Sequence, residues 1–258
     1  MKIVKLTAFL LSVCLSSCIS NRNVVYFPDP DFNTGTPVDI VNERQVYRLQ
    51  PRDVVSVRIK TVDVESANYF NIQPETGFQQ FNDVALYLNG YSLNEEGYIQ
   101  LPEVGKVLLS GLTLQEAQQK VQQAFSDYIN NATIMVKLVS FKITVLGEVN
   151  RPGYYYIYND QANLLEGIGI AGDLTDFGNR ENITLIRQTQ AGSEAILLNL
   201  KDPGLLSSDY YFLQPNDVLY VQPLQEKNTR DNLGTLPILS ILFGAVSSTI
   251  LLLGYVNR

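Results

Sequence analysis

Two segments of the chain are predicted to be helices whose first residues can be recognised from the sequence. In GLTLQEAQQKVQQAFSDYI, residues 111–129, Thr113 and Glu116 have the spacing of a capping box, in which each side chain bonds the other residue's backbone amide. The predicted helix carries six apolar residues along one face, which are Leu114, Ala117, Val121, Ala124, Phe125 and Tyr128. A second, shorter helix is predicted to open with Asn163 and Glu166 and to end near Gly172.

Around these helices the chain has the composition and alternation of β-strands. Strands are expected at about 46–60, 84–93, 98–109, 133–149, 183–187, 194–200 and 218–222. The NEEG sequence at 94–97 is typical of a hairpin turn, whereas residues 66–82 have no regular period and are expected to form a loop. This pattern predicts an α+β fold with two small mixed modules, residues 45–140 and 141–224.

One nine-residue phrase occurs twice. Residues 49–57 read LQPRDVVSV and residues 213–221 read LQPNDVLYV. Proline suits the second position of a β-turn, and Asp53 and Asp217 can bond nearby backbone amides. The repetition is either a common turn used twice by chance or the mark of two modules that each place a strand after the same turn.

The first twenty residues, MKIVKLTAFLLSVCLSSCIS, have the basic start and short apolar core of a signal peptide. The LSSC that closes this stretch resembles the lipobox of bacterial lipoproteins, in which cleavage before the cysteine leaves it as the lipid-bearing N-terminus. On this interpretation residues 1–17 are removed, Cys18 is lipidated, and residues 18–44 form an extended tether. The alternative is an ordinary secretory signal with an incidental cysteine.

A second membrane signal lies near the other end. Residues 233–256 carry no charged side chain, and a helix of about 21 residues is roughly 30 Å long, enough to cross a hydrocarbon core. Residues 225–232 are polar and predict a linker. Small or weakly polar residues form a stripe along the predicted transmembrane helix: Ser240, Gly244, Ser247 and Ser248. Such a stripe permits close helix packing, although a simple membrane tether does not require it.

The amino-acid composition argues against several classes of function. The formal charge of −7 argues against nucleic-acid binding, which needs a basic face. The chain has no histidine, so imidazole bases and histidine metal sites are absent. There is no phosphate-binding loop, nucleophile elbow or metal-ligand spacing. Glu95 with Glu96, or Asp173 with Asp176, could be imagined as a glycosidase pair, but adjacent carboxylates are more often solvated surface. We expect no enzyme activity, no cofactor and no metal.

Four blocks then carry a resemblance to a known family. YRLQPRDVVSV, GYIQLPEVGKVLLSGLTLQEA, VLGEVNRPGYYYI and LQPNDVLYV occur in the order seen in the Wza-like polysaccharide export outer-membrane lipoproteins. The first two blocks resemble the polysaccharide-export domain and the last two resemble one SLBB domain, a β-grasp module. The sequence departs from the family pattern at Arg52, where the family usually has glycine, and this suggests a different turn geometry there.

The resemblance implies a function and a set of partners. Relatives form rings, of eight subunits in known cases, that export capsule or exopolysaccharide and dock onto an inner-membrane polysaccharide co-polymerase of the tyrosine-kinase type. It implies an outer-membrane lipoprotein whose body faces the periplasm, because Ile19 and Ser20 follow Cys18 in place of an inner-membrane retention signal. The alternative is a lipid-anchored periplasmic scaffold or ligand-binding module whose terminal helix only tethers it.

Two short stretches supply further candidate residues. Glu148, Arg151 and Gly153 lie in the family's most legible block and are interpreted as a strand-end turn or a subunit contact. The YYYIY run that follows places alternate tyrosines, Tyr154, Tyr156 and Tyr158, on one face of a strand. These rings could stack on sugars, but core or interface packing is the commoner use of such a run.

Overall fold

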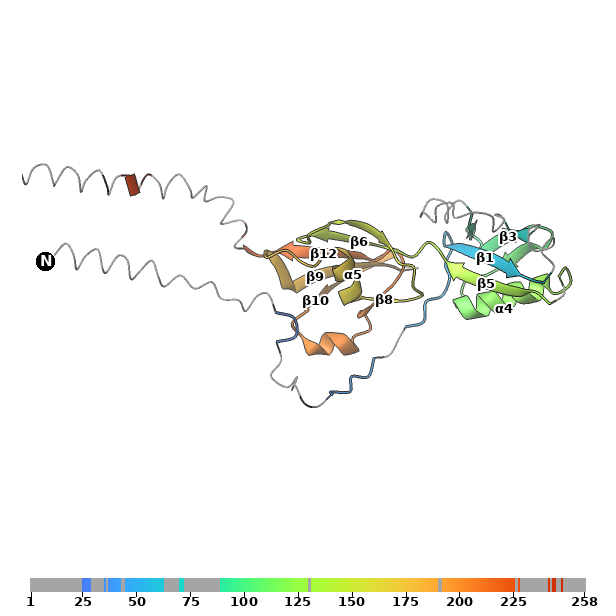
Figure 1. Cartoon of the computed structure of the whole chain (residues 1–258), viewed down its shortest axis with the longest axis horizontal. Helices are drawn as coiled ribbons and strands as arrows, with labels where there is room; N and C mark the ends of the chain where they lie inside the picture. Colours follow the sequence, from blue (N-terminus) through green and yellow to red (C-terminus); the bar gives the residue numbers. More distant parts are fainter. Residues whose placement is uncertain are drawn as a thin grey trace, which may run out of the picture.

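The computed structural model describes residues 25–28, 35, 37–42, 45–62, 70–71, 89–129, 131–189, 192–225, 227, 241, 243–244 and 247. Most of them belong to two modules, seen side by side in Figure 1, that combine strands and helices. Each module has its own buried core, and Leu138 packs against both cores where the chain passes from the first to the second. The mixed class of fold predicted from the sequence is confirmed.

The first module is built around a three-stranded antiparallel sheet in the order β2–β1–β5. Its elements are β1 (Val54–Lys60), β2 (Tyr91–Ser92), the hairpin of β3 (Tyr98–Leu101) and β4 (Gly105–Leu108), helix α4 (Leu114–Phe125) and β5 (Thr133–Leu138). Helix α4 packs against β5 and also contacts β4. Alternate residues of β1 point into the core, which is what the period of a half-buried strand requires.

Helix α4 begins where the sequence predicts. The Glu116 amide donates to the Thr113 hydroxyl (3.2 Å), and the Thr113 amide donates to the Glu116 carboxylate (2.8 Å), so the capping box is confirmed. The buried face consists of Ala117, Val121 and Phe125. The prediction that Tyr128 shares this face is wrong, because the helix ends at Phe125 and the Tyr128 side chain is 51% exposed.

The second module contains a five-stranded sheet in the order β10–β9–β12–β6–β7. Its strands are β6 (Lys142–Gly147), β7 (Gly153–Tyr156), β9 (Gly178–Thr189), β10 (Gly192–Leu198) and β12 (Val218–Pro223). The central pair, β12 and β6, is parallel, and the other neighbours are antiparallel. A parallel pair needs a long connection between its strands, and this connection supplies the rest of the module.

Part of that connection lies outside the sheet and contacts β6 through helix α5. It contains β8 (Ala162–Asn163), helix α5 (Leu164–Ile170), the 3₁₀ helix η2 (Pro203–Ser207) and β11 (Phe212–Leu213), which pairs with β8. The short helix predicted to open with Asn163 and Glu166 is confirmed, and the structure shows that these two residues form a capping box. Gly167 looks like a weak helix residue, but a Cβ there would lie 2.7 Å from the Leu213 side chain, so glycine permits the close packing of α5.

Three predicted strands differ in extent from the strands of the structure, two because they are divided and one because it begins later. The stretch 98–109 is not one strand, because residues 102–104 turn it into the β3–β4 hairpin and Glu103 takes a φ of 57°. The stretch 133–149 divides into β5 and β6 at residues 139–141, where the chain leaves one core and enters the other. The first strand begins at Val54 rather than at residue 46, because the preceding turn occupies residues 50–53.

The segments around Tyr26 and Leu224 contact the same part of the second module. The Tyr26 hydroxyl donates to Asp173, and the Tyr26 ring lies 5.4 Å from the Arg180 guanidinium. Near the other end, the Leu224 amide donates to the Phe177 carbonyl (2.8 Å). In Figure 1 the blue N-terminal stretch then passes the second module before it reaches β1. The segments that lead toward the two predicted membrane anchors therefore meet at residues 173–177.

The anchors themselves fall mostly outside the described residues. The signal peptide, Cys18, Ser240 and Ser248 are not among them, and neither is most of the predicted transmembrane segment 233–256. Within the described part of the chain, no helix has the length and apolar character needed to cross a membrane. Residues 241, 243, 244 and 247 are helical.

Candidate functional site at the junction of the two modules

The repeated phrase forms the same turn in both modules. Arg52 and Asn216 both take left-handed backbone conformations, with φ of 75° and 68°. In each turn the aspartate amide donates to the glutamine carbonyl at 3.1 Å, in Gln50–Asp53 and in Gln214–Asp217 alike. Each aspartate carboxylate also accepts a hydrogen bond from the backbone amide of the glutamine, at 2.9 Å in the first turn and 2.7 Å in the second. The shared letters therefore encode one closed turn that positions a buried aspartate.

The expectation of a different geometry at Arg52 is wrong. A φ of 75° is the conformation that glycine adopts without penalty, and here an arginine occupies it. The side chain extends into solvent and pairs with Glu95 at 3.0 Å, and both partners are more than 70% exposed. Such an exposed pair contributes little stability. It therefore does not offset the strain of the left-handed backbone at Arg52, which glycine would remove.

Arg52→Gly is expected to stabilise the first module by about 0.5–1 kcal/mol, because relief of the left-handed strain exceeds the entropy that glycine loses on folding. Asn216→Gly is the matched comparison and should change stability less, since asparagine tolerates this conformation. Urea denaturation of the full chain in detergent measures both variants. An unchanged or lower midpoint for Arg52→Gly would mean that the ion pair with Glu95 outweighs the strain.

The two turns lie on either side of the crossing between the modules. From the first turn, Asp53 accepts the Ser140 hydroxyl (3.4 Å), and the Val54 carbonyl accepts the Val139 amide (2.9 Å). From the second turn, the Asn216 amide donates to the Lys142 carbonyl at 2.7 Å. The segment 138–142 is thus hydrogen-bonded to a turn or strand of each module.

Asp53 is buried and fully engaged in hydrogen bonds. Its side chain accepts the Tyr47 hydroxyl (2.8 Å) in addition to the Gln50 amide and the Ser140 hydroxyl. Burial raises the pKa of the Asp53 carboxyl, and the hydrogen bonds from Gln50, Tyr47 and Ser140 oppose that shift. Burial also raises the pKa of Tyr47, with Asp53 and Asp217 adding to the shift. Tyr47 therefore remains a protonated donor, held by the first turn and near the second.

Asp217 forms a buried ion pair. Arg187 from β9 contacts both carboxylate oxygens, at 3.0 and 2.8 Å, and the two side chains are 6% and 0% exposed. The same guanidinium donates to the Phe212 carbonyl (2.9 Å) and lies 5.5 Å from the Tyr210 ring. Burial raises the pKa of Asp217, and the bonds from Arg187 and Gln214 oppose this shift. The second turn is thus tied to the centre of its own sheet.

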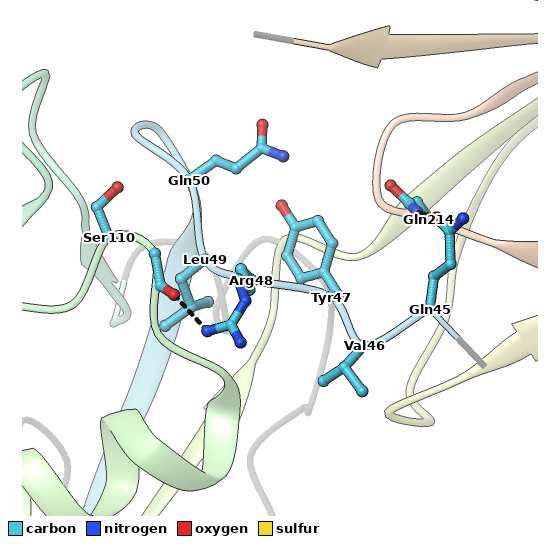
Figure 2. A pocket seen from close by; sticks show the side chains of 9 residues that line it. Gln45, Val46, Tyr47, Arg48, Leu49, Gln50, Ser110 and Gln214 are labelled. Atoms are coloured by element: carbon cyan, nitrogen blue, oxygen red, sulfur yellow. Dashed lines mark hydrogen bonds between the residues drawn. The ribbon is translucent and has the colours of Figure 1, made fainter. Parts of the chain in front are cut away.

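A pocket of about 300 Å³ opens beside these turns. Its lining consists of Gln45, Val46, Tyr47, Arg48, Leu49, Gln50, Ser110, Gly111 and Gln214. Figure 2 shows the Tyr47 ring between Gln50 on one side and the neighbouring side chains of Gln45 and Gln214 on the other. The glutamines at the first position of both repeated turns line the same pocket, so the pocket contains groups from both modules.

Glu148 and Arg151 make contacts within their own chain. Glu148 accepts the Thr175 hydroxyl (2.8 Å) and pairs with Lys227 in the segment that follows β12. The Arg151 guanidinium donates to the Ile170 carbonyl (3.0 Å) at the end of helix α5. Gly153 opens strand β7. The block thus connects β6 to α5 and to the C-terminal segment, and a subunit contact through these residues stays a prediction.

Glu148→Gln is expected to destabilise the C-terminal segment by up to about 1 kcal/mol, since this pair is partly exposed. The hydrogen bond from Lys227 holds the pKa of Glu148 below its ordinary value. A carboxyl with a lowered folded pKa contributes stability above its unfolded pKa and loses it as the pH falls through the folded value. Hydrogen exchange around residues 224–227 should therefore differ between wild type and variant at neutral pH. The two should converge at acidic pH, once the carboxyl is protonated in both states. A difference that persists there would contradict this assignment.

The tyrosine run divides between two surroundings. Tyr155 packs against the core of the second module. Tyr154 and Tyr158 are 69% and 73% exposed, and the Tyr154 and Tyr156 rings meet edge to face with centroids 6.2 Å apart. The alternation of the strand is thus preserved; Tyr154 lies on the edge strand β7, and Tyr158 follows two residues after the end of this strand.

Comparison with known families matches both modules. Residues 41–139 match the family described as "Polysaccharide biosynthesis/export protein", and residues 142–197 match the SLBB domain. The boundary between the two matches coincides with the crossing between β5 and β6. The chain belongs to the Wza-like polysaccharide export family. The second module extends beyond the matched residues, because β12 at 218–223 lies in the middle of its sheet.

Two curated relatives of the family are similar to this chain. "EPS I polysaccharide export outer membrane protein EpsA" of Ralstonia solanacearum is 25% identical over 149 residues, which cover 53% of this chain and 37% of that protein. The protein of the same name from Ralstonia nicotianae is 26% identical over 104 residues, covering 39% of this chain and 27% of that protein. The two matches therefore span only 37% and 27% of the relatives' own length.

Of the predicted residues in the terminal segment, the structure describes Gly244 and Ser247, and both are helical. Gly244 has no atom within 4 Å of a Cβ built on it, and the Ser247 hydroxyl donates to the carbonyls of Phe243 (2.8 Å) and Gly244 (3.1 Å). Ile241 and Phe243 are 68% and 69% exposed. Among the described residues, no cluster of three potential metal ligands occurs.

Sequence reasoning did not identify the pocket. The repeated LQPxD phrase was the available signal, because it places Gln50 and Gln214 at equivalent positions of two turns. Nothing in the phrase shows that the two turns come together. Arg187, the ion-pair partner of Asp217, lies in β9 without a distinctive local motif.

Proposed function

We propose that the protein is an outer-membrane component of capsule or exopolysaccharide export that assembles into a ring-shaped translocation channel. The observation that carries this proposal is the succession of a polysaccharide-export domain and an SLBB domain in one chain. The relatives' names, which refer to polysaccharide export and the outer membrane, support it. The substrate is a polysaccharide, and no nucleic acid is involved.

The contacts of Tyr26 and Leu224 with residues 173–177 support a topology. If Cys18 is lipidated and residues 233–256 form a membrane helix, both anchors extend from the same part of the second module. The second module then lies nearer the outer membrane, and the first module lies farther into the periplasm. In that position the first module is available to the inner-membrane co-polymerase that relatives are expected to bind.

A channel requires several copies of the chain, because one helix cannot enclose a pore. The helical stripe of Ser240, Gly244, Ser247 and Ser248 offers small residues at which neighbouring helices can approach closely. Ile241 and Phe243 are exposed, and a helical period of about 100° per residue places them at the two borders of this stripe, where they would contact lipid or a neighbouring helix. The thin polar lining that this stripe provides is the feature that favours the alternative, a lipid-anchored scaffold with a simple tether.

The variant Gly244→Leu distinguishes the channel proposal from the scaffold alternative. Leucine adds bulk where close approach is expected but makes the segment more apolar, so the helix should still insert while ring assembly and surface polysaccharide fall. Gly244→Ala, with one methyl group, is the matched control and should retain more of both. Rings are counted by electron microscopy in mild detergent. Unchanged assembly and unchanged export in Gly244→Leu would favour the scaffold.

The lipid anchor is tested separately with Cys18→Ala. The variant should incorporate no labelled fatty acid and should leave the outer-membrane fraction in part, since stable anchoring needs more than one membrane signal. Cys14→Ala is the control, because that residue lies within the predicted signal peptide. Label incorporated into Cys18→Ala would exclude Cys18 as the lipidation site.

A further inference from the structure

The junction pocket contains polar groups that the fold does not use. The Gln50 side chain makes no hydrogen bond to any other described residue, although it is half-buried. Gln45 and Gln214 share one long hydrogen bond of 3.5 Å, which leaves most of their capacity unused. Each amide offers two donors and one acceptor oxygen. Unused hydrogen-bonding groups that converge on a pocket mark a place where a polar ligand can bind.

We propose that this pocket binds a neutral sugar unit of the exported polymer. This inference rests on the proposed export function for the identity of its ligand, and it adds a recognition site within the junction. The occupant is a hydroxyl-rich ring, bound by amide groups from both modules and lying against the Tyr47 ring (Figure 2).

The lining favours a neutral ligand over an anion. Arg48 is the cation among the lining residues, and its guanidinium already donates to the Gly111 carbonyl (2.8 Å) and pairs with Glu116 (3.3 Å). None of the described residues that line the pocket carries a carboxylate, so a cationic ligand finds no counter-charge among them. Amides that both donate and accept match neighbouring hydroxyl groups, each of which is also a donor and an acceptor.

The Tyr47 ring and the backbones that carry Gln50 and Gln214 are held in place before a ligand arrives. Tyr47 is fixed by its hydrogen bond to buried Asp53, and Gln50 and Gln214 begin turns whose backbones are closed by buried aspartates. Pre-organised groups lose little freedom on binding, which favours affinity. A volume of about 300 Å³ is at the small end for ligand pockets and suits one or two sugar rings of a longer chain.

The test uses the full chain in detergent with oligosaccharides prepared by partial hydrolysis of the polysaccharide that the producing strain secretes. Saturation-transfer NMR and calorimetry measure binding to wild type, Gln50→Leu and Gln214→Leu. Each substitution removes hydrogen bonds and should weaken binding about three- to tenfold. Gln119→Leu, on the exposed face of α4, is the matched control and should bind as wild type does.

Other results would overturn the proposal. Equal binding by wild type and both pocket variants, or loss of binding in Tyr154→Ser, would place the sugar elsewhere, the latter on the edge of the sheet. Binding only of acidic oligosaccharides, abolished by salt, would exclude a neutral ligand. A wild-type protein that exports polymer in cells but binds no oligosaccharide would refute the pocket and leave the export function standing. If the wild-type protein bound oligosaccharide in the pocket but its cells did not export polymer, the channel proposal would be refuted and the pocket would stand.

Discussion

Replacing Gly147 with alanine is expected to destabilise the second module by at least about 3 kcal/mol, a large part of the stability of a small domain. A Cβ at this position would lie 2.0 Å from the Val221 carbonyl oxygen and 3.0 Å from the Val221 carbonyl carbon. Both are backbone atoms of the central strand β12, and the Glu148 amide donates to the same oxygen at 3.0 Å. The clash therefore cannot be relieved by a rotamer change. Thermal and urea unfolding of the full chain measure the loss.

Gly105→Ala is the matched control for this prediction. Gly105 has a φ of 86°, against 88° for Gly147, but a Cβ added at Gly105 would have no atom within 4 Å. Alanine there introduces only left-handed strain, about 1–2 kcal/mol. If the two variants lost equal stability, the backbone conformation rather than the approach of β12 would explain the effect at Gly147.

Asp217→Asn is expected to cost about 3 kcal/mol or more, because it leaves the buried Arg187 guanidinium without its counter-charge. The substitution keeps the size of the side chain and an oxygen that can accept the Gln214 amide, so packing is retained. The loss should appear in the unfolding of the second module. Binding of oligosaccharides to the junction pocket should weaken as well, since Gln214 belongs to the same turn.

Glu95→Gln provides the contrast, because it breaks the exposed pair with Arg52. Charges in solvent are screened and pay side-chain entropy to pair, so no measurable change in stability is expected. The double variant Arg187→Met with Asp217→Leu should recover part of the loss seen in Asp217→Asn, since it leaves no unpaired buried charge. Equal losses in Asp217→Asn and Glu95→Gln would show that water reaches the Arg187–Asp217 pair.

Local patterns predicted the helices better than the strands. Both capping boxes, at Thr113 and at Asn163, depend on groups three residues apart, and the structure contains both. Strand boundaries depend on where the chain turns from one core to another. The pattern of 133–149 is continuous because residues on both sides of the crossing are buried, each in a different core.

The candidate site shows the same division. The LQPxD phrase specified the turn, because proline, the left-handed third residue and the aspartate act within four residues of one another. It did not specify the partners of the two aspartates. Asp53 finds Ser140, 87 positions away, and Asp217 finds Arg187, 30 positions away. Those pairings depend on the order of strands in each sheet.

The sequence alone therefore predicted features that depend on neighbouring residues: the helix caps, the two turns, the charge-free segment and the family blocks. The packing of β12 between β6 and β9, the bonded crossing at 138–142 and the pocket shared by Gln50 and Gln214 were not. Caps and turns arise from neighbouring residues, whose geometry the backbone fixes locally. Contacts between distant residues appear only when burial of the two cores brings the strands together, because no local interaction encodes the register of a distant partner.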